Sequence, residues 1–291
     1  KVIPSVAGLD LASLVLAIVV QLVLMALTLM LVAGMLRGHQ VAVTGVAQQA
    51  RQLQLWHLAL AGEALARQRL AQAPVTATSP ITHLGQAWSV PQRFRHEDAE
   101  VRVTLEDLSG RFNLNALTRA GQVDTLTLQR WQQLRESLAI EALPAELFQG
   151  RVLLSLEQLR VLPGVDRELL QRLRPWVTLL PDGAGLNVNT LSTSLLARLE
   201  GLQVAALQPL FQQRPAQGWA SVQQFAAEPL AQRLGIASHG LSVASRWFAA
   251  HVEVHDGGQV LHLYSELHRD PQSARIRVVR RTLSRLGEQG R

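Results

Sequence analysis

Few side chains in this 291-residue chain are arranged for catalysis or metal binding. The sequence contains no cysteine, which excludes disulfides, thiolate metal sites and cysteine nucleophiles. Nine histidines are scattered, and the closest group is His251, His255 and His262. On the strand expected there, we interpret His251 and His255 as not sharing a face, and we predict no metal site. Gly257-Gly258 is typical of a hairpin, and no G-x-S-x-G or phosphate-loop pattern occurs. The sequence therefore predicts a protein that is not an enzyme.

An apolar segment near the amino terminus must sit in a different solvent from the rest of the chain. Residues 11–36 carry no charge. A bilayer core needs about 20 apolar residues in a helix, so we predict one membrane span, with a buried core helix as the alternative. Lys1 precedes the segment, whereas Arg37 and Arg51 follow it, so a positive-inside count places the globular part in the cytoplasm.

The residues after the span continue as a helix. Residues 37–73 contain no proline, and their apolar positions recur at helical spacing. These positions are Val43, Val46, Ala50, Leu53, Leu58, Leu65 and Leu70. We predict a single helix from about Leu9 to Gln72, with its second half amphipathic and packed on a soluble domain. The alternative is a signal anchor followed by a separate helix.

Patterns with a period of two residues flank a central helical block. Residues 93–105 end in an alternating strand, and residues 241–254, 260–267 and 275–282 predict three strands joined by hairpin turns. The six tryptophans are interpreted as core or interface anchors. An α+β architecture follows. The expected segments are a leader at 1–10, a membrane helix at 11–36, its amphipathic continuation at 37–73, the first part of the sheet at 80–120, an inserted helical domain at 121–236 and a β-meander at 237–291.

Two helix-hairpin-helix patterns lie in the central block, at residues 156–177 and 186–225. Their hairpins are Pro163-Gly164-Val165 and Glu200-Gly201-Leu202, and Asn189, Thr190 or Ser192 could cap a helix. DNA-binding hairpins bring backbone amides and basic residues to a phosphate. Here Asp166 and Glu200 place carboxylates where the phosphate would sit, and residues 141–240 carry eight arginines and eight acidic residues although the whole chain is at +6. We favour a structural or protein-binding role.

Several segments resemble those of one family. They are the apolar amino-terminal helix, LEDLSGRFNLNAL at residues 105–117, LPGV at 162–165 and LNVNT at 186–190. The chain resembles the minor pseudopilin K family of type II secretion, or general secretion pathway protein K, over nearly its full length. The resemblance implies a pseudopilin fold, in which a long N-terminal transmembrane helix packs on an antiparallel β-sheet. It also implies a large inserted all-α domain with two helix-hairpin-helix-like (SAM-like) units.

The resemblance further implies a non-enzymatic function in protein secretion. With the minor pseudopilins I and J, the protein would form the tip complex that initiates and caps the pseudopilus, which drives export of folded proteins across the outer membrane. Other implied partners are H, the major pseudopilin, the inner-membrane assembly platform and the prepilin peptidase, and no nucleic acid is expected. The protein would cross the inner membrane once with its globular part in the periplasm. An upstream basic leader would reverse the positive-inside count.

Processing in this family implies cleavage between Gly8 and Leu9, although only one lysine precedes this position and Asp10 follows it. Pseudopilins in general carry a glutamate five residues after the cleavage point, which neutralises the amino terminus of a neighbouring subunit, and members of the K family lack it. The corresponding residue here is Ser13. A subunit without this buried carboxylate suits the end of a filament.

The resemblance also implies that calcium can bind in the globular part. Calcium prefers clustered oxygen ligands, and the candidates are Glu106, Asp107, Asp124, Asp256 and Asp270. No Asp-x-Asp-x-Asp run occurs, so we favour the interpretation of Asp107 and Asp256 as turn residues.

Two other functions stay open at this point. The first is a membrane-anchored helix-hairpin-helix DNA receptor of a competence or DNA-uptake system, and the second is a type IV pilus-like minor pilin. DNA binding that is lost at high salt would favour the receptor.

Overall fold

The structure, a computed structural model, describes residues 11–72, 81–117, 124–148, 150, 152–181, 183–271 and 273–285. The chain divides into two compact units, Lys1–His57 and Leu58–Arg291. Helix α1, Leu11–Ala71, passes through the boundary. The prediction of one continuous helix is therefore confirmed over the described residues. Gly8 and Leu9 lie outside the described residues, and Ser13 lies in α1 with its side chain outside the description.

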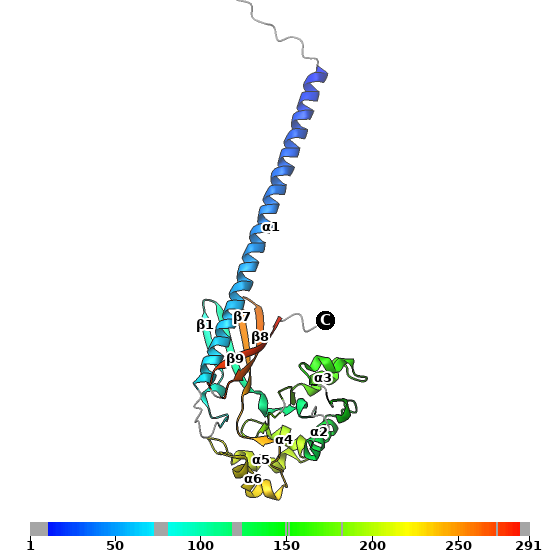
Figure 1. The fold of residues 1–291 in the computed structure, drawn as a ribbon. Helices are drawn as coiled ribbons and strands as arrows, with labels where there is room; N and C mark the ends of the chain where they lie inside the picture. Colours follow the sequence, from blue (N-terminus) through cyan, green and yellow to red (C-terminus); the bar gives the residue numbers. More distant parts are fainter. Residues whose placement is uncertain are drawn as a thin grey trace, which may run out of the picture. The chain divides into compact units, whose positions relative to one another are not determined.

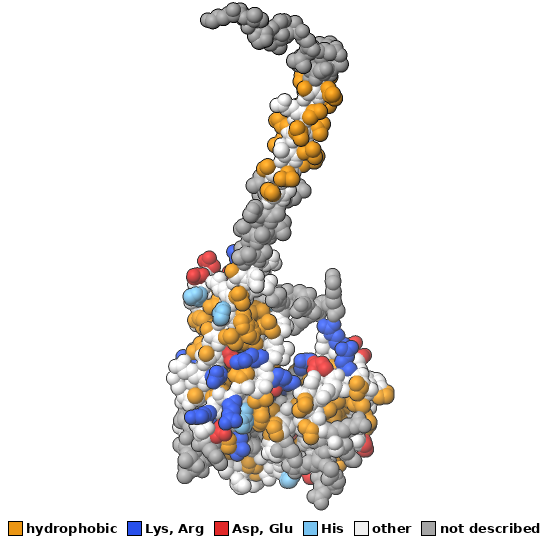
Figure 2. All heavy atoms as spheres, turned by 45° about the horizontal axis from the view of Figure 1, so that its top comes forward, with side chains coloured by type: hydrophobic (Ala, Val, Ile, Leu, Met, Phe, Trp, Pro, Cys, Tyr) orange, Lys and Arg blue, Asp and Glu red, His pale blue; other side chains and the backbone are white. Residues whose placement is uncertain are grey.

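The first unit contains the predicted membrane span. Val15–Met35 is a 21-residue stretch of α1 with a mean hydropathy of 2.9, long and apolar enough to cross a bilayer. Its large side chains are exposed on every face of the helix, as Figure 2 shows for one side. A helix that is apolar all round is stable in lipid or within a bundle of similar helices, since water would have to solvate the whole surface.

The second unit is organised around a five-stranded antiparallel sheet with the strand order β1-β2-β7-β8-β9 (Figure 1). The strands are β1 Gln92–His96, β2 Ala99–Asp107, β7 Trp247–Asp256, β8 Gln259–Arg269 and β9 Ile276–Arg285. Strand β2 pairs with β7, although the segment between Asp107 and Trp247 separates them in the sequence. The predicted insertion of a central block between neighbouring strands is therefore observed.

One strand prediction is confirmed and another needs correction. The alternating strand predicted at the end of residues 93–105 is β2, which forms a hairpin with β1 because Glu97 has a positive φ of 52° and turns the chain. The predicted strand at 241–254 is broken. Its first two residues form β6, Leu241–Ser242, which pairs in parallel with β5, Leu186–Asn187, and the long strand β7 begins only at Trp247.

Most of the regular secondary structure in the inserted segment is helical, but the segment also contains short strands. Strand β3, Phe112–Asn113, pairs in parallel with β4, Val177–Thr178, and β5 pairs with β6. The predicted insertion at 121–236 is therefore not all α. It contains β4 and β5, which pair with strands in the segments on either side of it. The helices outside the sheet are η1 Ala87–Ser89, η2 Leu108–Gly110, η3 Leu114–Leu117, α2 Thr125–Ser137, η4 Ala145–Phe148, η5 Leu156–Val161, α3 Arg167–Leu173, α4 Thr193–Leu199, α5 Val204–Gln212, α6 Val222–Ala227 and α7 Pro229–Arg233.

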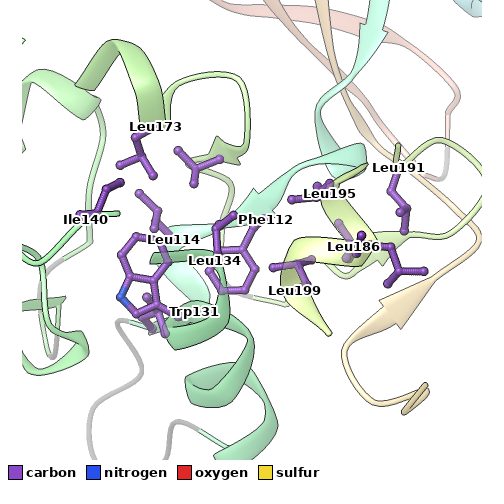
Figure 3. Close-up of a cluster of buried hydrophobic side chains, with 14 of the residues drawn as sticks. Phe112, Leu114, Trp131, Leu134, Ile140, Leu173, Leu186, Leu191, Leu195 and Leu199 are labelled. Carbon is purple, nitrogen blue, oxygen red and sulfur yellow. The ribbon is translucent and has the colours of Figure 1, made fainter. Parts of the chain in front are cut away.

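The insertion has its own hydrophobic core, part of which Figure 3 shows. Trp131 on α2 stacks on Phe112 with ring centroids 5.9 Å apart and meets the edge of Phe148 at 5.6 Å. A second aromatic pair, Trp219 and Phe225, is 4.9 Å apart. Both tryptophans are at most 1% exposed, so the interpretation of these residues as core anchors is confirmed.

Within the second unit, the C-terminal end of α1 lies directly on the sheet (Figure 1). Gly62 makes the close approach possible. A Cβ atom at this position would lie 2.5 Å from Val252 Cγ1, which is closer than real Cβ contacts come, and 3.2 Å from Val103 Cγ2, which is a tight contact. The helix therefore approaches β2 and β7 at a distance that only glycine allows.

Candidate assembly site at the junction of sheet and insertion

A buried carboxylate connects the end of β2 to the inserted segment. Asp107 is 3% exposed, and its Oδ1 accepts a hydrogen bond from the Ser109 N–H at 2.9 Å. Its Oδ2 accepts three more, from Asn187 Nδ2 at 2.9 Å, Thr190 Oγ1 at 2.5 Å and Ser245 Oγ at 2.5 Å. We call Asp107, Asn187, Thr190 and Ser245 the junction hub. The hub connects three segments: the end of β2, the part of the insertion around β5, and the segment between β6 and β7 where the chain returns to the sheet.

Burial makes the charged form of Asp107 in the hub energetically unfavourable. Burial raises the pKa of Asp107, and the four donors offset this effect only in part. Arg269, itself buried, lies close enough for the charge of Asp107 to favour its protonated form, although burial lowers the pKa of Arg269 overall. Neutral donors thus hold a carboxyl group in an apolar interior, and such an arrangement is stable only when every member is bonded.

Asparagines at three further positions, 113, 115 and 189, extend the same bonding pattern into the insertion. Asn115 Oδ1 accepts from the Leu153 N–H at 2.9 Å, and its Nδ2 donates to the Leu153 and Leu180 carbonyls at 3.0 and 3.1 Å. Asn113 Oδ1 accepts from the Leu180 N–H at 2.9 Å. These asparagines are buried, and they satisfy backbone groups that no regular strand or helix pairs.

Asn189 does the same for the loop that carries Trp219. Its Oδ1 accepts from the Trp219 N–H at 2.8 Å, and its Nδ2 donates to the Trp219 carbonyl at 3.0 Å. Gly218 has a φ of +70°, and a Cβ atom there would lie 2.7 Å from the Asn189 side chain. The buried polar residues of the motifs at 105–117 and 186–190 therefore stabilise the fold through hydrogen bonds.

A second buried carboxylate fastens α1 to the sheet. Glu63 is 2% exposed and accepts from Arg281 Nε at 2.7 Å, from Arg281 Nη2 at 2.8 Å and from Ser265 Oγ at 2.6 Å. Burial alone would raise the pKa of Glu63, but the hydrogen bonds and charge of Arg281 outweigh it and lower this pKa. This pair is not among the features predicted from the sequence, although an acidic residue on the apolar side of a helix is a signal for it.

The carboxylates of the two hairpins, Asp166 and Glu200, have different partners. Asp166 Oδ1 accepts from the Leu169 N–H at 2.7 Å and so caps α3, which occupies an amide that a phosphate would need. Glu200 instead turns toward the buried Arg130, with Nη2 to Oε1 at 2.7 Å. Arg130 of α2 therefore pairs with this carboxylate, and its place relative to a bound phosphate stays a prediction. Ser192 caps α4, and this confirms one of the predicted caps.

The histidines need a correction. His251 and His255 share the face of β7 that points away from α1, because alternate residues of a strand point the same way. His251 Nε2 lies 3.6 Å from Glu106 Oε2, and Glu253 Oε1 and Oε2 lie 3.8 Å from His262 Nδ1 and 3.5 Å from His255 Nε2. Even so, no group of three or more histidines and acidic residues in the described part of the chain has the geometry of a metal site.

The calcium candidates are dispersed. The residue opposite Asp107 in the sheet is Phe248, eight positions from Asp256, so that Asp107 and Asp256 are about 26 Å apart along the strands. Asp124 caps α2 and accepts from the Thr127 N–H at 2.9 Å.

The two remaining candidates also have local partners. Glu106 forms an ion pair with Arg111 at 2.6 Å, and Asp270 accepts from the Ser273 N–H at 2.8 Å within its turn. The carboxylates of Glu106, Asp107, Asp124 and Asp270 bond to the protein, and no group of three or more metal-ligating side chains forms among the described residues. The described candidates therefore do not fit a shared calcium site, and calcium binding stays a prediction.

Sequence comparison decides the family of the chain. Type II secretion system protein K of Pseudomonas aeruginosa is 30% identical over 297 residues, which cover 88% of this chain and 88% of that protein. The chain belongs to the type II secretion system protein K family. The family model for protein K matches residues 186–244, which include the hub residues Asn187 and Thr190 and end one residue before Ser245.

Other members of the protein K family agree in sequence and in structure. The Pectobacterium carotovorum protein K is 28% identical over 281 residues, which cover 80% of this chain and 84% of that protein. The fold is similar to a chain of the crystallised GspK-GspI-GspJ complex from enterotoxigenic Escherichia coli, with a TM-score of 0.66 and 26% identity. This similarity covers 82% of the present chain and 98% of that one. The predicted family and its helix-and-sheet fold are confirmed.

Proposed function

We propose that this protein K is the subunit that joins the minor pseudopilins I and J in a complex at the tip of the pseudopilus, without enzymatic activity. The observation that carries the proposal is the similarity to a chain of the GspK-GspI-GspJ complex over 98% of that chain. The fold supports it, because α1 combines an apolar span with a C-terminal end that packs on a sheet. The globular part would lie in the periplasm and the span in the inner membrane.

The tip position fits two features of the chain. Ser13 stands where the family resemblance places the missing glutamate, so a neighbouring amino terminus would find no carboxylate there. The insertion between β2 and β7 is long, and a bulky lobe is easier to place at the end of a filament than within it. H and the major pseudopilin would join below the tip, and the assembly platform and prepilin peptidase would act before assembly.

Co-purification tests the proposed complex. The full chain is expressed with the I and J proteins of the same organism, extracted in detergent and purified through a tag on this chain. We expect a stable ternary complex at physiological salt. If neither partner is retained, and if the chain instead binds duplex DNA at low salt but not at high salt, then the DNA-receptor alternative replaces the proposal.

Topology and calcium are tested separately. A reporter that is active only outside the cytoplasm, fused after Arg285, should be active if the globular part is periplasmic. Calcium binding is tested by titration calorimetry of the full chain, and saturable heat that is lost on adding chelator would support the family-based prediction.

A further inference from the structure

Gln21 places a strong hydrogen-bonding group inside the apolar span. It is the seventh residue of Val15–Met35, so it lies about 9 Å from the start of the span at 1.5 Å per residue. Its side chain is exposed, and the structure shows no hydrogen bond between it and any described residue. Lipid tails offer no donor or acceptor, and an unpaired amide in hydrocarbon is strongly unfavourable.

The other polar side chain of the span has no such need. Thr28 Oγ1 lies 3.0 Å from the Leu24 carbonyl oxygen and 2.9 Å from that of Met25, so its hydroxyl bonds to its own helix. A threonine bonded in this way can face lipid. The amide of Gln21, in contrast, needs a partner from another chain.

We propose that the face of α1 centred on Gln21 docks against the membrane helix of another minor pseudopilin, which presents a hydrogen-bonding side chain at the same depth. The inference rests on the proposed function, because it names the membrane contact of that complex. A different protein is the expected occupant instead of a second copy, because the solved relative was crystallised in a complex with two different chains.

Helical geometry defines this face. At 100° per residue, Ala17, Leu24 and Thr28 lie within about 60° of Gln21, whereas Val19, Val23 and Met30 lie on the opposite side. Ala17 is small, so a neighbouring helix can approach closely on that side. Both faces are apolar, so the amide of Gln21 is the feature that selects between them.

Site-specific crosslinking tests the face, because the sequence contains no cysteine that would interfere. The full chain, carrying either Leu24→Cys or Val23→Cys, is expressed with I and J proteins that carry single cysteines along their spans, and the membranes are oxidised. We expect crosslinks to I or J from position 24 and not from position 23. Equal crosslinking from both positions, or crosslinks only between copies of this chain, would overturn the inference.

A second comparison isolates the amide. In the Leu24→Cys background, Gln21→Leu should reduce the crosslink about fivefold, Gln21→Asn should reduce it less, and Thr28→Val should leave it unchanged. An unchanged crosslink in Gln21→Leu, while the wild-type chain still co-purifies with I and J, overturns this inference alone. Failure of the wild-type chain to co-purify overturns the proposed function and the inference together.

Discussion

Two buried carboxylates show how the partners of a residue decide its electrostatics. Glu63 faces the guanidinium of Arg281, and its pKa is lowered. Asp107 faces hydroxyl, amide and backbone donors, which carry no full charge, and its pKa is raised by burial. The same functional group therefore stabilises the fold at neutral pH in one place and is tolerated in the other only because four donors surround it.

Glu63→Gln should destabilise the second unit by about 2 kcal/mol at pH 7, because Arg281 loses its partner. Since the folded pKa of Glu63 is lowered, its contribution is present above the unfolded value of about 4.3 and is lost as the pH falls through the folded pKa. Urea unfolding of both chains at pH 7 and pH 3 measures the difference, which should shrink in acid. Exposed Glu146→Gln is the control, and a gap that stays constant with pH would contradict the assignment.

Asp107→Ala should cost about 3 kcal/mol, because it removes the acceptor of four hydrogen bonds in a buried site. Asp124→Ala removes a helix cap and an exposed contact with His239, and it should cost about 1 kcal/mol. Chemical denaturation of the two variants compares them. Equal losses would show that the hub adds nothing beyond a local turn.

At the scale of elements, the contact between α1 and the sheet depends on a missing side chain. Gly62→Ala would gain up to about 1 kcal/mol of helix propensity, but its methyl group would collide with the stiff Val252 and Val103 side chains. We expect a net loss of about 1 to 2 kcal/mol, measured by thermal or urea unfolding. In the same helix, Gly34→Ala adds a methyl group where no atom lies within 4 Å and should not destabilise the protein. A more stable Gly62→Ala variant would contradict this packing.

At the scale of the whole molecule, the span should decide where the protein resides. Replacing Leu22, Leu24 and Leu29 together by arginine places three charges in the stretch 15–35, each costing about 3 kcal/mol in a bilayer centre. The variant should be extracted from membranes by alkaline carbonate, while the wild type stays in the pellet. Arginines at the exposed residues Leu84, Val161 and Val279 are the control, and extraction of both variants alike would argue against a span.

The sequence by itself determined the features that depend on local pattern. The uncharged run from Leu11, the helical spacing after it and the hairpin at Gly257-Gly258 all predicted elements that the structure contains. Periodicity and turn chemistry are properties of neighbouring residues, which is why they can be recognised without a fold. The family resemblance was carried by the same kind of short segment.

Only the tertiary structure decided what the singled-out polar residues do. Asp107 meets Asn187 and Ser245, and Glu63 meets Arg281, from 80 to 218 residues away, so no local pattern could reveal either bond. Glu200 likewise pairs with Arg130, which is distant in the sequence. The strand predicted from residue 241 ends at Ser242, because these two residues pair with the distant strand β5. Long-range partners compete with local preference once burial makes an unpaired group costly, and the folded chain satisfies those partners first.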